Sequence, residues 1–193
     1  MKKVFLALMA VAAIAFTGCN KDPKLSQEEK DMALVTAAKD ALDTDGKALV
    51  DFLTKNGYTS MGDNVFKNGN EYCSIANTQN GLVSEIDIYT MIRPSNFEAS
   101  KSYFLRMETA AATVFPSGFE GECSLGENLY QFDTELEFRN YAAQVTEGQF
   151  TETWNRCHAR SDFNGTPVRE ITFENSLDAG IWICDLHIWK PEV

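Results

Sequence analysis

Three Asn-Gly pairs constrain the fold of this chain more than any other local feature. Each pair lies between segments rich in β-branched and aromatic residues. Asn-Gly is typical of two-residue hairpin turns, because both central residues of such a turn need positive φ. We therefore expect antiparallel strands connected by short hairpins. The pairs are Asn68-Gly69, Asn80-Gly81 and Asn164-Gly165.

The Asn80-Gly81 pair also predicts a strand register. A two-residue turn at this point sets Ile75 opposite Ile86, so that the apolar residues of both strands share one face. The acidic residues of the second strand then point to the other face. The sequence thus predicts a three-stranded meander over residues 60–91, with one apolar face and one polar face.

Two or three helices are expected beside these strands. Ser26 and Glu29 form an S-x-x-E capping box, which opens a helix expected to continue to Asn56 across a weak stretch at residues 43–46. Apolar spacing predicts a second helix between residues 95 and 115. A short third helix is expected near residues 136–145, after a glycine-containing loop over residues 117–126.

The C-terminal part of the chain returns to strand patterns, over residues 150–162, 167–174 and 179–189. The last strand has an unbroken apolar face and a partly apolar second face, which indicates an interior strand. The fold class expected is α+β, with an antiparallel sheet of about six strands and the helices on one face. An αβββ pseudo-duplication fits the same order of elements. The apolar face consists of Trp182, Cys184, Leu186 and Ile188.

The first nineteen residues form a separate segment. Two lysines precede an apolar run over residues 4–16, and Thr17 and Gly18 lie directly before Cys19. A basic start, a short apolar run and small residues describe a secretory signal peptide, and the run is too short for a comfortable membrane-spanning helix. The end of this segment resembles the lipobox of bacterial lipoproteins, in which the cysteine is lipidated and becomes the first residue of the mature chain.

This resemblance implies a division of the chain into three parts. Residues 1–18 would be the lipoprotein signal peptide, residues 19–25 a polar tether beginning at lipidated Cys19, and residues 26–193 a single globular α+β domain. Acyl chains on one cysteine hold a protein firmly at a membrane, because each buried methylene contributes about 0.8 kcal/mol. The expected location is the bacterial outer membrane. The resemblance leaves open whether the domain faces the periplasm or the cell surface.

The charge of the chain excludes some partners. The net charge is −11, and the first eighteen residues contain two lysines and no acids, so their removal makes it −13. A body this acidic has no broad positive field for phosphate groups, which argues against nucleic-acid binding. It also argues against the domain itself lying on an anionic lipid surface. The only membrane partner expected is the one reached through Cys19.

Four cysteines remain beyond the anchor, namely Cys73, Cys123, Cys157 and Cys184. An even number in an exported chain predicts two disulfides, and three connectivities are open. No pair of these cysteines has the spacing of a zinc site. We therefore expect neither a metal nor a cofactor.

Asp185 and His187 are the weak catalytic candidates. They share a face of the last strand, where a carboxylate could orient an imidazole beneath Trp189, as in a hydrolytic dyad. Residues two apart on a strand are separated by about 7 Å, which is too far for direct contact unless the side chains lean together. No nucleophile motif accompanies the pair. A solvated strand end is the alternative interpretation.

Trp154 and Trp189 are the weak binding candidates, because both lie among polar residues. Exposed tryptophans at strand ends suit a surface that stacks on sugars or peptides, although packing at the rim of the core is the alternative. The sequence therefore favours a lipid-anchored envelope protein with a non-catalytic binding or accessory domain for an envelope protein, peptide or glycan. An envelope hydrolase with a site near Asp185 and His187 is one alternative, and a structural or assembly lipoprotein is another.

Overall fold

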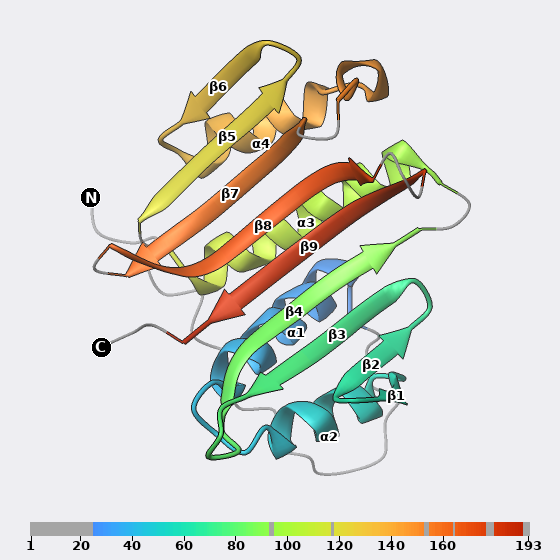
Figure 1. The fold of residues 1–193 in the computed structure, drawn as a ribbon, viewed down its shortest axis with the longest axis vertical. Coiled ribbons are helices and arrows are strands. Elements are labelled where there is room, and N and C mark those ends of the chain that lie inside the picture. The colour runs from blue at the N-terminus through green and yellow to red at the C-terminus, as the bar shows by residue number, and fades with distance from the viewer. Residues whose placement is uncertain are drawn as a thin grey trace.

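The chain builds one antiparallel sheet of nine strands, with helices on one side of it (Figure 1). The computed structural model describes residues 25–92, 95–116, 118–152, 155–163, 165–176 and 180–190. The helices are α1 (Gln27–Ala41), α2 (Lys47–Lys55), α3 (Phe97–Val114) and α4 (Glu135–Gln144), with a 3₁₀ turn η1 (Glu147–Gln149). The strands are β1 (Thr59–Gly62), β2 (Val65–Asn68), β3 (Glu71–Asn77), β4 (Val83–Met91), β5 (Phe119–Leu125), β6 (Asn128–Phe132), β7 (Arg156–Phe163), β8 (Thr166–Ser176) and β9 (Ile181–Trp189).

The expected α+β class is confirmed, and so is the packing of helices on one face. The expected numbers are wrong, because the described residues contain nine strands and four α-helices instead of about six strands and two or three helices. The spatial order of the strands is β1-β2-β3-β4-β9-β8-β7-β5-β6. Three local features account for most of the difference, and the short strand β6 is the ninth strand.

The first feature is a break between α1 and α2, where a single helix was expected. Asp43 and Gly46 adopt φ angles of 65° and 71°, which no helix accommodates. The N–H of Asp43 donates to the carbonyl of Val83 (2.9 Å), and the N–H of Val83 donates to the carbonyl of Thr44 (2.8 Å). The interruption therefore pairs with the start of β4, and these tertiary hydrogen bonds replace helical ones.

The second feature is a hairpin between β1 and β2, which turns the expected three-stranded meander into four strands. Asp63 and Asn64 form its turn with φ angles of 49° and 59°.

The third feature is strand β5, which occupies the expected loop at residues 117–126. In β5, Gly121, Cys123 and Leu125 face the core while the residues between them face outward, so the segment alternates like a strand.

The hairpin register predicted from Asn80-Gly81 is confirmed. Ile75 lies opposite Ile86, and both are buried on the inner face of the sheet. The loop is wider than a two-residue turn, because the N–H of Thr78 donates to the carbonyl of Leu82 (2.8 Å) and the pairing shifts by one residue before it. The prediction thus holds for the strands and not for the turn itself.

The two halves of the chain meet at the centre of the sheet, where β4 pairs with β9. The prediction that the last strand is an interior strand is confirmed by this position. Helices α1 and α3 pack against each other on one side of the sheet (Figure 1). The core lies between helices and sheet, and its centre is an aromatic cluster in which Phe173 stacks on Phe104 (5.5 Å between ring centroids) and on Trp182 (5.4 Å).

Candidate functional site

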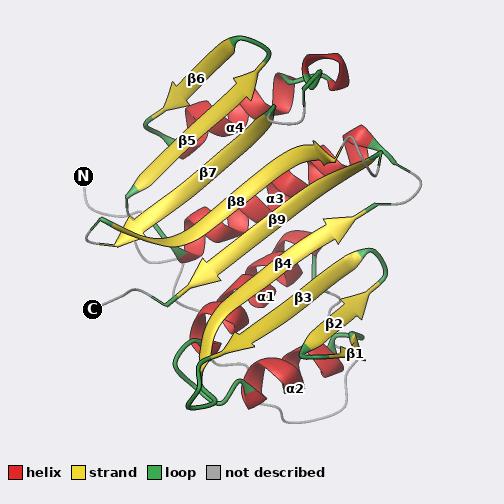
Figure 2. Ribbon diagram, in the orientation of Figure 1, coloured by secondary structure: helices red, strands yellow, loops and turns green. Residues whose placement is uncertain are grey.

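One side of the sheet has no helix over it among the described residues. Figure 2 shows the helices on the far side of the strands, and we call the opposite side of the sheet the open face. On β4 and β9, buried Ile88 and Leu186 point to the helices, and the residues next to them point to the open face. The open face carries both histidines of the chain and more acids than bases. Its titratable residues on the described strands are Lys67, Glu85, Asp87, Glu120, Glu122, Arg156, His158, Arg160, Asp162, Glu170, Glu174, Asp185 and His187.

The strand register arranges part of this set in a row across the sheet. Asp87 of β4 lies opposite His187 of β9, and His187 lies opposite Glu170 of β8. Glu170 in turn lies opposite Arg160 of β7. Directly opposed residues in antiparallel strands have Cβ atoms about 4.5–5.5 Å apart, so each acid neighbours a basic or imidazole side chain. The row is thus built by pairing between strands that are distant in sequence.

His187 is held from two sides. Its Nδ1 lies 3.1 Å from Asp87 Oδ1, and its Nε2 lies 3.7 Å from Glu85 Oε2. Its ring stacks on Trp189, with 4.0 Å between the ring centroids and 14° between the planes. The carboxylates of β4 and the indole of Trp189 therefore fix the orientation of the imidazole.

Asp185 has a different environment from the one expected beside His187. No ion pair or hydrogen bond joins the two side chains, and Asp185 Oδ1 is buried without a hydrogen-bond partner. Burial, together with the charge of Asp87, raises the pKa of Asp185 to about 6. The carboxylate that contacts the histidine comes from the neighbouring strand, and not from the same strand.

The hydroxyl that donates to Asp87 does not complete a hydrolytic triad with His187. Ser74 Oγ donates to Asp87 Oδ2 (3.1 Å), on the far side of the carboxylate from His187. A nucleophile and its general base need the imidazole between the hydroxyl and the carboxylate. Here the carboxylate lies in the middle, so His187 is not placed to take a proton from Ser74.

The second histidine lies on the other half of the open face. His158 Nε2 is 2.7 Å from Glu170 Oε1, and this contact is the main cause of the lowered pKa of Glu170. A depression of about 540 Å³ extends from His158 over β5 and β7. Its arginines are paired inside it, because Arg160 Nη2 lies 2.6 Å from Glu120 Oε2, and Arg156 also pairs with a glutamate of β5. The depression therefore offers no free cationic group of β7.

Aromatic residues border the acidic centre of the open face. Tyr72 and Tyr89 stack with 5.1 Å between their centroids and 4° between their planes. The Lys67 ammonium lies 5.1 Å from the centroid of Tyr72. Trp189, a binding candidate from the sequence, lies half-buried on this face. Trp154, the other binding candidate, and Cys19, the predicted lipid anchor, lie outside the described residues.

Sequence reasoning missed Asp87 and Glu85 as partners of His187. The hairpin register already placed both carboxylates on the polar face of β4. The pairing of β4 with β9 was the missing fact, and nothing in the local sequence encodes it.

The four cysteines of the domain are buried thiols in the structure. Cys123 and Cys157 lie directly opposite each other on β5 and β7, with 2.8 Å between their Sγ atoms. Cys73 on β3 and Cys184 on β9 have strand β4 between them. Two strand spacings amount to about 9.6 Å, which exceeds the Cα separation of about 7 Å that a disulfide tolerates. Cys123 and Cys157 are therefore the pair that this fold sets directly opposite each other, and the expected two disulfides stay a prediction.

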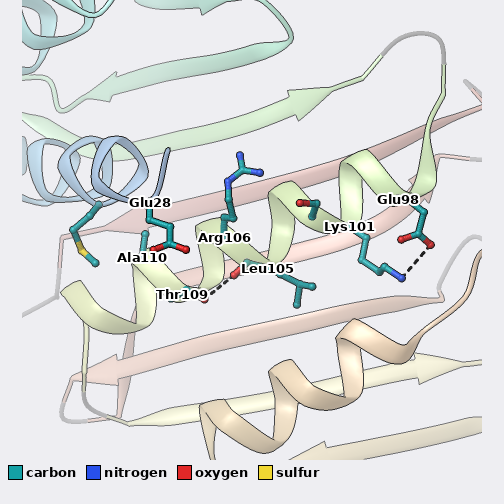
Figure 3. Close-up of a pocket in the computed structure, with 9 residues that line it drawn as sticks. Glu28, Glu98, Lys101, Leu105, Arg106, Thr109 and Ala110 are labelled. Atoms are coloured by element: carbon teal, nitrogen blue, oxygen red, sulfur yellow. Dashed lines mark hydrogen bonds and ion pairs between the residues drawn. The ribbon is translucent and has the colours of Figure 1, made fainter. Parts of the chain in front are cut away.

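A groove of about 460 Å³ lies on the helical side, along α1 and α3 (Figure 3). Its cations are already paired, since Lys101 Nζ lies 3.2 Å from Glu98 Oε1 and Arg106 Nε lies 2.8 Å from Asp31 Oδ2 of α1. No histidine or cysteine lines it. The groove consequently offers neither an imidazole nor a thiol. Its apolar lining residues are Met32, Leu105 and Ala110.

In the part of the chain that the structure describes, no group of three or more histidine, cysteine or acidic side chains is arranged to hold a metal ion, and no helix has the length and apolar character needed to cross a bilayer. The chain matches no family model, no curated protein and no solved structure. The features that bear on function are therefore the open face and the N-terminal segment.

Proposed function

We propose that this protein is a lipid-anchored component of the bacterial cell envelope whose domain binds a partner through the open face. The observation that carries the proposal is a polar and aromatic sheet face with no helix over it among the described residues. Supporting it from the sequence is the segment that ends at Cys19, with the features of a signal peptide and a lipobox. The partner is an envelope protein, peptide or glycan.

Binding is favoured over catalysis because each histidine of the open face is held by carboxylates of neighbouring strands. His187 contacts Asp87 and Glu85, and His158 contacts Glu170. An envelope hydrolase near Asp185 and His187 is the second candidate, and the raised pKa of Asp185 is the observation in its favour. It lacks an aligned hydroxyl or thiol. A structural or assembly lipoprotein would use the same face for a permanent partner.

A comparison of two surface variants tests the proposed binding face. Trp189→Ala removes the aromatic side chain that stacks on His187, and Leu136→Ala removes an apolar side chain that is 64% exposed on α4. The full chain and both variants, each carrying an affinity tag, are incubated with envelope extract, and the retained proteins or glycans are quantified. We expect Trp189→Ala to lose at least about 80% of the specific ligand, because a central aromatic side chain can contribute 2 kcal/mol or more. Equal retention by Trp189→Ala and wild type would refute the assignment of this face.

We also infer an αβββ pseudo-duplication at the level of the fold. Each half of the chain begins with a central helix, α1 or α3, and ends in a central strand, β4 or β9. The two central strands pair with each other, and so do the two helices. Such a duplication requires that α1 with β2–β4 superposes on α3 with β7–β9.

A further inference from the structure

A small cavity in the N-terminal half of the domain lies on the helical side of the sheet, and not on the open face. It has a volume of about 200 Å³ and lies between α1, α2 and the hairpin that joins β2 to β3. Its polar wall includes two carboxylates, Asp31 of α1 and Glu71 of β3. Phe52 and Tyr58 supply aromatic lining. We call this cavity the N-terminal pocket.

The two carboxylates differ in how their charge is balanced. Asp31 is 3% exposed and is fully partnered, because Arg106 Nε and Gln27 Nε2 each donate to it at 2.8 Å. Glu71 accepts hydrogen bonds from two neutral phenols, those of Tyr58 and Tyr103. No lysine, arginine or histidine within the described ranges forms an ion pair with Glu71.

This imbalance has a direct physical consequence. Glu71 is half-buried, and desolvation raises its pKa, although the hydrogen bond from Tyr103 and the charge of Arg106 partly oppose the shift. The two phenols use only part of its acceptor capacity, because a carboxylate offers about four lone-pair positions. Glu71 itself lines the cavity.

The surroundings of Glu71 select among cations. The cavity combines a carboxylate with aromatic side chains, a lining that suits an organic cation. A primary ammonium carries three donors, and aromatic rings such as those of Phe52 and Tyr58 attract cations. A volume of about 200 Å³ equals roughly six or seven water molecules at about 30 Å³ each, which is enough for an amine of a few carbon atoms.

We propose that the N-terminal pocket binds the primary ammonium group of a small ligand, with Glu71 as its counter-ion and Phe52 as its aromatic wall. The proposal is independent of the open face, because the two surfaces share no residue.

Calorimetric titration of the full chain in a non-ionic detergent, at pH 7.5, tests this site. The probes are n-butylammonium chloride and n-butanol, which have similar shapes and differ in charge. We expect saturable binding of the amine, at least about tenfold tighter than that of the alcohol, because hydrogen bonds to a charged group are the stronger ones. Glu71→Gln should weaken amine binding by about tenfold or more. The control Glu127→Gln, which removes an exposed carboxylate in a turn, should change it less than about twofold.

Circular dichroism shows whether Glu71→Gln folds. If it does not fold, a second variant provides the test. Phe52→Leu retains the carboxylate and should weaken amine binding by about two- to fivefold through loss of the aromatic wall. Equal binding of amine and alcohol would overturn the proposal, as would an absence of heat up to about 50 mM, far above the Kd expected even for so small a ligand. Binding that appears only in Lys30→Met would also overturn it, because the exposed Lys30 at the pocket would then be the native counter-ion.

Discussion

Glu108 and Arg169 are fully buried between α3 and the inner face of the sheet. Arg169 Nη2 lies 3.8 Å from Glu108 Oε1, and Arg139 Nε of α4 lies 3.5 Å from Glu108 Oε2. Arg169 Nε donates to Ser161 Oγ (3.0 Å), but neither oxygen of Glu108 has a hydrogen bond. Glu108 is therefore linked to the two arginines by electrostatic attraction and not by hydrogen bonds. Apolar side chains of the core surround Glu108 and Arg169.

The pH dependence of stability should reveal this cluster. Burial raises the pKa of Glu108 to about 7, although both arginines oppose the shift. An acid whose pKa is higher in the folded state than in the unfolded state stabilises the fold at pH values below its unfolded-state pKa. This stabilisation is lost as the pH rises through the folded-state pKa. We therefore expect the free energy of unfolding to fall by about 1–3 kcal/mol between pH 4.5 and 7.5. Asp185, with its pKa of about 6, adds to the same decline.

Urea unfolding at several pH values measures this effect. In Glu108→Gln the decline should be clearly smaller than in wild type, whatever the absolute stability of the variant. Glu137→Gln, which alters an exposed glutamate of α4, serves as the control and should keep the full decline. An unchanged pH profile in Glu108→Gln would show that Glu108 does not titrate in this window.

At the scale of elements, the break between α1 and α2 depends on Gly46. Its φ of 71° is unfavourable for other residues, and a Cβ there would lie 2.9 Å from Cγ2 of Val83. Gly46→Ala should therefore destabilise the domain by about 2–4 kcal/mol in urea unfolding, combining backbone strain with overpacking. Gly126→Ala has a similar φ of 61° and open space around its Cβ, so it should lose only about 1 kcal/mol. Equal losses in the two variants would contradict the role of the contact with Val83.

The opposed cysteines of β5 and β7 lead to a second prediction about elements. Cys123 and Cys157 should form a disulfide in the exported protein. In the chain-entropy model, a bridge that closes this loop stabilises the folded state by about 4 kcal/mol. With Cys19 lipidated, the denatured and unreduced protein should show two titratable thiols, those of Cys73 and Cys184. Thiol titration after reduction should show four. Four thiols before reduction would exclude the bridge.

Local sequence predicted those elements whose determinants are local. Alternation of apolar residues and the Asn80-Gly81 turn were sufficient for the register of β3 and β4 and for the burial of β9. The helix break could not be predicted in the same way, because it depends on hydrogen bonds to Val83, which is about forty residues away in sequence. Strand β5 was mistaken for a loop because Gly118, Gly121 and Gly126 masked its alternation.

The candidate site was only partly predictable for the same reason. The sequence placed His187 and Trp189 on one face of the last strand, and the structure stacks them. It also suggested Asp185 as the partner of His187, whereas the contact is with Asp87 across β4 and β9. Neighbours within a strand are visible in sequence, but neighbours across a sheet depend on its topology.

At the scale of the whole molecule, the domain has two unlike sides. One side of the sheet packs on the helices (Figure 2) and contains the core. The other side carries acids, both histidines and stacked aromatic residues. A protein held at a membrane through its N-terminus could present such a face to partners nearby. Attachment of the chain to the membrane through Cys19 is therefore the central claim, because it determines in which compartment the open face meets its partner.

Metabolic labelling with a radioactive fatty acid, followed by membrane fractionation, tests that claim most directly. Wild-type protein should carry the label and sediment with the outer membrane, because several acyl chains on one cysteine give nearly irreversible anchoring. Cys19→Ala should lose the label and fail to be processed at residue 18. Equal labelling and membrane association of Cys19→Ala and wild type would contradict the account.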